Sequence, residues 1–259
     1  MLYKPLKKFG QNYLTDENIL KKIYQEISPL PSDNILEIGP GYGALTKYFT
    51  SHPNYIGVEI DSRTYSVLCQ NFPYLNFINE DFLKTNISKL FSNNKFRVIG
   101  NIPYNITSPI VFKLIENLNY VIDATLMVQY EVAKRIIAKP NTKDYSILTV
   151  ITDYFMEKKF CFKVSKNCFN PKPNVDSAII HLYIKNQSNL PCNNQLFINV
   201  VKAAFSTRRK QLKNSIKISS FANIDFTNSP VSLTLRAEEL SLNDYISLTQ
   251  FISQQIGGT

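Results

Sequence analysis

Short hydrophobic runs alternate with amphipathic stretches through the larger, N-terminal part of the chain. The runs are rich in β-branched and aromatic residues and predict strands at Asn34–Ile38, Tyr55–Glu59, Asn76–Ile78, Phe96–Ile99 and Thr125–Gln129. The stretches between them have apolar residues at helical spacing and predict helices at Asp16–Ser28, Ser62–Asn71 and Pro109–Leu118, the last capped by Thr107 or Ser108. Strands that alternate with helices indicate a parallel sheet covered by helices on both faces.

Two further hydrophobic runs, Lys159–Val164 and Ala178–Ile184, follow this alternating pattern. The proline-containing segment 167–176 between them is too short for a helical crossover, so we expect these two strands to pair antiparallel. The sequence therefore predicts an α/β, Rossmann-like fold with a seven-stranded sheet, mostly parallel with an antiparallel closing strand.

A polar stretch, Asn186–Asn194, separates this part from a C-terminal part whose pattern is helical to the end. Ser241 is placed to cap the last helix. The apolar face of that helix comprises Leu242, Tyr245, Ile246, Thr249, Ile252 and Ile256. We therefore expect two domains, residues 1–185 and a small all-α domain at residues 192–259.

The composition is that of an ordinary globular protein, with 44% hydrophobic and 19% charged residues in a chain of 259. No apolar run reaches the roughly 18 residues that a membrane-spanning helix needs, and the lysine-rich residues 1–10 lack the apolar stretch of a signal peptide. We therefore expect a cytoplasmic protein without a membrane partner. The four cysteines form no CxxC pair, and with His52 and His181 they give no zinc-ligand spacing, so no metal is expected.

The net charge of +9 favours a polyanionic partner. Six cations lie in residues 202–217, a segment without Asp or Glu: Lys202, Arg208, Arg209, Lys210, Lys213 and Lys217. The alternative is a solvated helix face, but such a face normally mixes charges of both signs. The segment therefore predicts a surface that binds phosphates.

A glycine-rich turn, residues 37–46, directly follows the first predicted strand of the sheet. Gly39 and Gly41 let the backbone turn tightly and approach a ligand closely. Glu59 ends the next strand, where its carboxylate can accept both hydroxyls of a ribose. The same pattern also fits a nicotinamide dinucleotide fingerprint, and glycines in a tight turn are often only structural. This motif alone leaves dehydrogenase and methyltransferase open.

The third predicted strand is followed by Asp81 and Phe82. A carboxylate at this position can accept a hydrogen bond from the exocyclic amine of an adenine, while Phe82 packs against the ring. A surface acid after a strand is the alternative. The ligand reading is favoured because ligands bind at the carboxyl ends of the strands in open α/β sheets.

The fourth predicted strand leads into Asn101-Ile102-Pro103-Tyr104. The lone pair of an adenine amine is delocalised into the ring, so methylating it is difficult. A site can help by accepting both amine hydrogens, which draws the nitrogen toward a tetrahedral geometry. The Asn101 side-chain carbonyl and the Ile102 backbone carbonyl are candidates for this role. Pro103 stiffens the turn, and Tyr104 offers a face for stacking. The alternative is an ordinary proline-containing strand-to-helix turn.

The run Asn101–Pro109 resembles the signature of the ribosomal RNA adenine dimethyltransferase family. The resemblance extends over nearly the whole chain, through Phe9–Leu14 (with Tyr13 where Phe is usual), Gln129–Arg135, Phe169–Ser177, Ala204–Lys210 and Arg236–Ser241. It implies a class I methyltransferase fold that uses S-adenosylmethionine and releases S-adenosylhomocysteine. Four features resemble the small-subunit (16S), ribosome-maturation branch rather than the branch that methylates large-subunit RNA: Pro109, the run Pro171–Ser177, the arginine-rich start of the C-terminal domain and Arg236–Ser241.

The resemblance implies a role for each candidate residue. The cofactor would contact Gln11, Asn12, Leu14, Gly39, Gly41, Glu59, Ile60, Asp81, Phe82 and Asn101. The target adenine would contact Asn101, Ile102, Pro103 and Tyr104, with Phe169 on its other face. We expect a monomer that dimethylates two adjacent adenosines near the 3′ end of small-subunit RNA within an assembling subunit. The remaining alternatives are a nicotinamide-dependent oxidoreductase and an RNA-binding assembly factor in which methylation is secondary.

Overall fold

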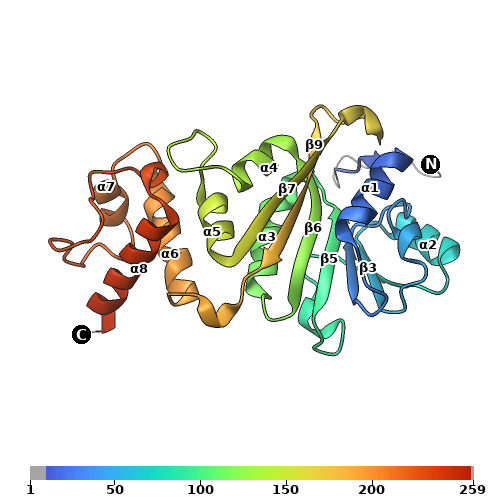
Figure 1. Ribbon diagram of the computed structural model, residues 1–259, viewed down its shortest axis with the longest axis horizontal. Helices are drawn as coiled ribbons and strands as arrows, with labels where there is room; N and C mark the ends of the chain where they lie inside the picture. The colour runs from blue at the N-terminus through green and yellow to red at the C-terminus, as the bar shows by residue number, and fades with distance from the viewer. Residues whose placement is uncertain (1–9, 258–259) are drawn as a thin grey trace. The chain divides into compact units, whose positions relative to one another are not determined.

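The computed structural model describes residues 10–257, and the expected family residue Phe9 lies outside this range. Its main sheet has the strand order β4-β3-β2-β5-β6-β9-β7. The strands are β2 (Ile35–Ile38), β3 (Tyr55–Glu59), β4 (Asn76–Asn79), β5 (Phe96–Asn101), β6 (Val121–Gln129), β7 (Met156–Val164) and β9 (Ser177–Ile184). A separate antiparallel pair joins β1 (Tyr13–Leu14) to β8 (Phe169–Asn170). Figure 1 labels β3, β5, β6 and β9 across the sheet.

The predicted parallel direction of the first five strands and the presence of an antiparallel strand beside them are confirmed. Strands β4, β3, β2, β5 and β6 run parallel, and β9 is antiparallel to β6. The last strand in sequence, β9, lies between β6 and the edge strand β7. Strand β6 begins four residues before the predicted start because its Asp123 is buried without interrupting the strand. Arg97 on β5 compensates this charge with an ion pair of 2.7 Å to the Asp123 carboxylate.

Three α-helices accompany the parallel strands: one precedes β2, one connects β3 to β4 and one connects β5 to β6. Helix α1 (Glu17–Ile27) begins after Asp16, whose side chain accepts from the backbone amides of Asn18 and Ile19. Helix α2 spans Ser62–Asn71 as predicted. Helix α3 (Thr107–Glu116) has no side-chain cap, so the predicted cap by Thr107 or Ser108 is wrong. Thr107 is already helical, and the 3₁₀ turn η4 (Tyr104–Ile106) leads directly into the helix.

The core on one face of the sheet lies under α1. Apolar residues of α1, including Leu20, Ile23 and Ile27, pack with Ile35, Tyr55, Ile99, Met127 and Ile179 from five of the strands. Neighbouring strand residues point to the opposite face. The residues there, such as Leu36, Val98 and Leu126, are also buried, which explains why these strands read as continuous hydrophobic runs. Figure 1 shows α1 beside the strands at the N-terminal end of the chain.

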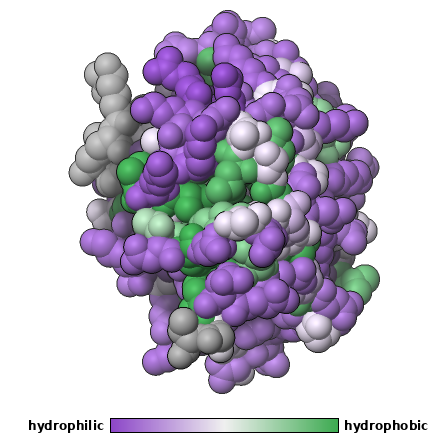
Figure 2. Space-filling view, turned by 90° about the vertical axis from the view of Figure 1, so that its left-hand side faces the viewer, coloured by the Kyte–Doolittle hydropathy of each residue, from purple (hydrophilic) through white to green (hydrophobic). Residues whose placement is uncertain are grey.

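The chain divides into two compact units by its internal contacts. The first contains the described part of residues 1–133 and Lys158–Ile184, and the second contains Lys134–Glu157 and the chain from Lys185 onward. We expected a single boundary near residue 185, whereas the segment Lys134–Glu157 groups with the C-terminal helices. Strand β7 returns the chain to the sheet after this excursion. Figure 2 shows one face of the molecule, on which hydrophilic residues surround a hollowed apolar band.

The second unit is built from helices. They are the C-terminal end of α4 (Tyr130–Ile136), then α5 (Ile147–Phe155), α6 (Asn194–Ala204), α7 (Leu212–Lys217) and α8 (Leu242–Gly257). The predicted cap of α8 is present, because the Ser241 hydroxyl accepts from the Asp244 amide and the Asp244 carboxylate accepts from the Ser241 amide. The predicted apolar face needs correction. Ile256 is 50% exposed near the chain end, and Leu248 is buried in its place. No helix within residues 10–257 is long and apolar enough to span a membrane.

Candidate active site

Two cavities lie at the carboxyl ends of β2, β3 and β5 in the first unit. The smaller has a volume of about 70 Å³, and the larger has a volume of about 380 Å³. The smaller cavity is lined by Gly10–Tyr13, Gly39, Gly41, Glu59, Ile60 and Asn101–Tyr104. The lining of this cavity therefore contains most of the site residues that were predicted from separate sequence motifs. Leu14 lines the larger cavity instead, together with Gly39 and Asn101.

The glycine turn has the backbone conformation that only glycine adopts easily. Gly39 and Gly41 have φ angles of +64° and +62°. A Cβ atom on Gly39 would meet nothing within 4 Å, so the space above this residue is open to a ligand. A Cβ atom on Gly41 would lie 2.8 Å from the Tyr13 ring, so Gly41 is needed for close packing of Tyr13 over the turn.

The Glu59 carboxylate is buried and held in one orientation. Its Oε2 accepts from the Gly41 amide at 2.9 Å, and its Oε1 accepts from the Asp61 amide at 2.9 Å. Burial raises the pKa of Glu59. Ile60 beside it is 45% exposed, which leaves an apolar surface at the end of β3. A fixed carboxylate next to an apolar surface is suited to a ribose with an attached ring.

Asp61 is a site residue that the sequence analysis missed. Its Oδ2 accepts from Gln11 Nε2 at 2.9 Å, so it holds the N-terminal strap, defined as residues 10–14. Both Asp61 oxygens also accept from the Arg63 guanidinium. This ion pair holds the pKa of Asp61 at about 2. The sequence signal was the Asp directly before α2, which is a typical cap, and nothing in the sequence connected it to Gln11.

Asn101 contacts the N-terminal strap from the opposite side. Its Nδ2 donates to the Asn12 backbone carbonyl at 3.0 Å. A carbonyl oxygen only accepts, so this contact sets which end of the amide faces Asn12. The Oδ1 atom is consequently available as an acceptor toward the cavity that Asn101 lines. This is the orientation that the proposed contact with an amine requires.

Tyr104 and Ile102 complete the turn after β5. The Tyr104 hydroxyl shares a hydrogen bond of 2.7 Å with the Ser177 hydroxyl of β9, which fixes the position of the hydroxyl end of the ring. Burial raises the pKa of Tyr104, so the hydroxyl stays protonated. The Ile102 side chain is buried, and its backbone amide donates to the Met127 carbonyl on β6 at 3.3 Å. The turn is therefore anchored to two neighbouring strands.

Three predicted site residues line neither cavity. Asp81 Oδ1 accepts from the Leu83 amide, which places this carboxylate at the start of the loop after β4. Phe82 is buried beneath the Lys113 ammonium, which lies 5.7 Å from the ring centroid. Phe169 is 5% exposed and belongs to the core, where its strand β8 pairs with Leu14 of β1. Phe169 therefore packs in the core and holds the N-terminal strap through the pairing of β8 with β1.

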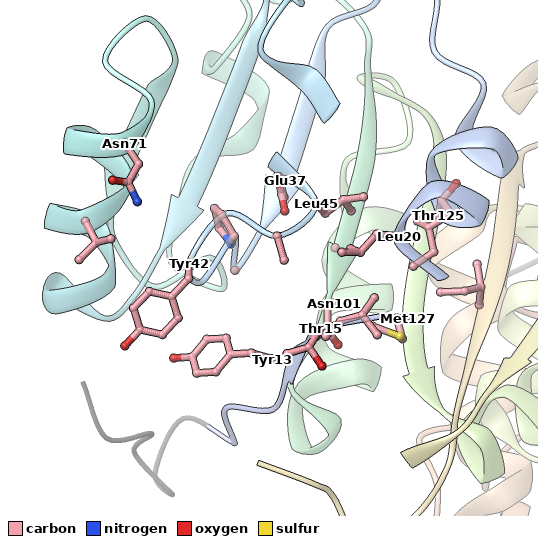
Figure 3. Close-up of a pocket in the computed structure, with 18 residues that line it drawn as sticks. Tyr13, Thr15, Leu20, Glu37, Tyr42, Leu45, Asn71, Asn101, Thr125 and Met127 are labelled. Atoms are coloured by element: carbon pink, nitrogen blue, oxygen red, sulfur yellow. The ribbon is translucent and has the colours of Figure 1, made fainter. Parts of the chain in front are cut away.

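The larger cavity extends from the glycine turn toward α1 and β6. Figure 3 shows Tyr13 and Tyr42 side by side at one end, with Glu37, Thr125 and Met127 among the residues around the space. Glu37 Oε2 accepts from the hydroxyls of Thr46 and Tyr55 at 2.9 and 2.5 Å. Burial raises the pKa of Glu37 to about 7. Tyr13 lines both cavities, so it forms part of the wall between them.

The predicted RNA-binding cations lie on the second unit, and all six are exposed: Lys202, Arg208, Arg209, Lys210, Lys213 and Lys217. The Arg208 guanidinium is bound by other groups of the protein. Its Nε donates to Glu238, and its Nη2 donates to the backbone carbonyls of Lys143 and Tyr145. No cluster of three or more potential metal ligands occurs in the part of the chain that the structure describes.

Comparison with known proteins shows one family over nearly the full length. A family model described as ribosomal RNA adenine dimethylase matches residues 4–254. A relative from Francisella tularensis subsp. novicida, named ribosomal RNA small subunit methyltransferase A, is 44% identical over 96% of this chain and 98% of its own length.

Solved structures agree with this result. A dimethyladenosine transferase from Plasmodium falciparum superposes with a TM-score of 0.75 at 30% identity, covering 91% of this chain and 95% of the other. The 23S rRNA methyltransferase ErmE superposes with a TM-score of 0.67 at 26% identity, covering 94% of this chain and all of the other. The predicted class I methyltransferase fold is thereby confirmed.

Proposed function

Because the chain belongs to the ribosomal RNA adenine dimethylase family, we propose that the site around Asn101 and Glu59 transfers methyl groups from S-adenosylmethionine to adenine in small-subunit ribosomal RNA. The targets are the exocyclic amines of two adjacent adenosines near the 3′ end, and the modification belongs to maturation of the subunit. The orientation of the Asn101 amide is the observation that supports this proposal most directly.

The residues present fit a bound S-adenosylmethionine. The open space above Gly39 leaves room for the methionine part beside the strap residues Gln11, Asn12 and Leu14. The fixed Glu59 carboxylate would accept the ribose hydroxyls, with the exposed side of Ile60 against the adenine ring. Asp81 would approach the far end of the ring from the loop after β4, whereas Phe82 is buried in the core. The cofactor supplies a methyl group that is already activated by the sulfonium, so the protein needs no metal for this step.

The target amine would be held by two acceptors. Asn101 Oδ1 and the Ile102 backbone carbonyl would each accept one amine hydrogen, which directs the nitrogen lone pair toward the methyl group. Tyr104, held by Ser177, would stack on the base. Alignment of the amine with the methyl group would supply most of the rate enhancement. In the second methylation the amine has one hydrogen left, so one of the two acceptors would hold it, and the proton released in each methylation would pass to solvent. To enter this pocket, the adenine has to leave its stack in the RNA.

Membership of the family decides between two of the earlier alternatives. A nicotinamide-dependent oxidoreductase shares the glycine turn and Glu59, but it has no use for the Asn101–Tyr104 turn. The small subunit is favoured over the large subunit as substrate because of the identity and coverage of the small-subunit relative. Arg209, Lys210, Lys213 and Lys217 would contact the RNA backbone, and backbone contacts position the enzyme without reading bases.

Transfer of labelled methyl from S-adenosylmethionine to purified, undermethylated small subunits tests the proposal, with large-subunit RNA in parallel. We expect label on the small subunit alone. Label on the large-subunit RNA would move the activity to the other branch. If neither RNA is labelled while the protein still binds small subunits, the assembly-factor alternative replaces the enzymatic one.

A further inference from the structure

We propose that the loop 139–143 of the second unit is an additional contact with the RNA backbone, made by Lys139 and Lys143 and held in position by Arg208. The proposal rests on the proposed function, because it takes ribosomal RNA as the partner. Neither lysine belongs to the basic segment 202–217, and the sequence placed both in the first domain. The structure groups them with that segment in the second unit.

Arg208 connects the loop to the basic segment. Its Nη2 donates to the backbone carbonyls of Lys143 and Tyr145, the latter at 3.0 Å, and its Nε donates to Glu238 Oε2 at 3.1 Å. Glu238 contacts the loop as well, since its backbone carbonyl accepts from the Asn141 amide at 2.8 Å. The Arg208 guanidinium is therefore bound by groups of the protein itself. These contacts hold the part of the chain from which Arg209 follows.

The loop has a defined shape of its own. The Thr142 hydroxyl donates to the Lys139 carbonyl at 2.7 Å, and the Tyr145 amide donates to the Thr142 carbonyl at 3.1 Å. Asn141 takes a left-handed conformation with φ of +63°, which short polar side chains tolerate. Tyr145 ends the loop with a buried ring whose hydroxyl donates to the Leu240 carbonyl. A loop fixed at this many points presents its side chains without a large ordering cost on binding.

The loop exposes two ammonium groups that the protein does not neutralise. Lys139 and Lys143 are both exposed, and neither ammonium forms an ion pair with any residue in the range 10–257. Asp144 is the one carboxylate between residues 139 and 145. Arg209 and Lys210 follow Arg208 directly and are also exposed. Arg208 thus connects the loop 139–143 to the basic segment 202–217.

Unpaired lysines at a rigid site suit phosphates, which need charge and no fixed base geometry. An acidic peptide offers the same charge, but RNA is the polyanion on which the family acts. Each lysine that contacts a phosphate contributes about 0.7–0.9 to the salt dependence of binding, on a log–log scale. Two such lysines would therefore contribute about 1.5.

The test is the binding of full-length protein to a fluorescent fragment from the 3′ part of small-subunit RNA, over a series of KCl concentrations. We expect Lys139→Gln/Lys143→Gln to lower the salt slope by about 1.5 and to weaken binding severalfold at low salt. The matched control is Lys89→Gln/Lys95→Gln, which removes the same charge from exposed positions before β5. It should leave the slope unchanged.

A third variant, Arg209→Gln/Lys210→Gln, separates this inference from the proposed function. If it lowers the slope while Lys139→Gln/Lys143→Gln behaves like the control, the loop is not a contact and the proposed RNA surface stands. If the unmodified protein shows no salt-dependent binding at all, the RNA surface fails and the loop contact fails with it. Thermal unfolding of each variant identifies any loss of binding that comes from misfolding.

Discussion

The Asn101 side-chain amide donates to the backbone carbonyl of Asn12 at 3.0 Å, although 89 residues separate the two in sequence. The contact joins the N-terminal strap to the turn after β5. Because the strap is also bound to Asp61 through Gln11, it connects the end of β3 to the end of β5 across the smaller cavity. Binding of the cofactor and orientation of the target amine should therefore depend on each other through residues 10–14.

Asn101→Ala removes the proposed acceptor for the target amine. We expect kcat to fall by about 10²–10³, as for loss of one preorganised polar group at a reacting centre. Affinity for S-adenosylmethionine, measured by calorimetry, should change less than kcat. A variant with nearly normal kcat and greatly reduced cofactor affinity would assign Asn101 to cofactor binding alone.

Gln11→Ala removes the hydrogen bond between the strap and Asp61 and leaves the Asp61–Arg63 ion pair in place. We expect affinity for S-adenosylmethionine to fall about tenfold, the size of one hydrogen bond to a charged group. Gln11→Glu should weaken affinity further because it sets two carboxylates against each other. Equal affinities for all three proteins would show that the strap does not cover the cofactor.

Glu37 predicts a pH dependence of stability. Its folded-state pKa of about 7 lies above the ordinary value of 4.5, so the folded protein holds a proton that the unfolded chain releases. Stability from this group is present at low pH and is lost as the pH rises from about 4.5 through 7. Relative to Glu37→Gln, the unmodified protein should lose about 2–3 kcal/mol of unfolding free energy between pH 5 and 8. Parallel urea titrations measure this difference, and curves that stay parallel across this range would show that Glu37 titrates normally.

Arg208 and Arg209 are neighbours with different predicted roles. Arg208→Gln should lower the unfolding free energy by about 1 kcal/mol, because it removes contacts to Glu238 and to two backbone carbonyls at a partly exposed site. Arg209→Gln should leave stability unchanged and weaken RNA binding. Chemical denaturation and the RNA assay together separate the two. An Arg208→Gln protein with unchanged stability and unchanged RNA affinity would show that Arg208 does not hold the loop 139–143 in position.

The order of secondary structure elements and much of the cavity wall were predictable from sequence because their signals are local. Hydrophobic runs indicated the parallel strands. The positions at the ends of those strands indicated Gly39, Glu59 and Asn101 as site residues. The Asp61–Gln11 contact was not predictable, since it joins residues 50 positions apart without a sequence pattern. The internal role of Arg208 was hidden for a related reason. In the sequence alone, an arginine that binds RNA phosphates cannot be distinguished from one that binds two backbone carbonyls.

The domain boundary shows a further limit. Residues 134–157 interrupt the first unit and group with the C-terminal helices, but their pattern is an ordinary helix followed by a strand. The start of β6 was predicted four residues too late, because the strand contains the charged Asp123. Arg97 of the neighbouring strand neutralises this charge. In both cases the deciding partner lies far away in sequence.

Analysis of the modified nucleosides tests the central claim most directly. Undermethylated small subunits are incubated with the protein and S-adenosylmethionine, the RNA is digested, and the nucleosides are measured by mass spectrometry. We expect N6,N6-dimethyladenosine at two adjacent positions near the 3′ end, formed about 10²–10³ times more slowly by Asn101→Ala. Methylation by Asn101→Ala at an unreduced rate, or methylation of another base, would contradict the assignment of this site.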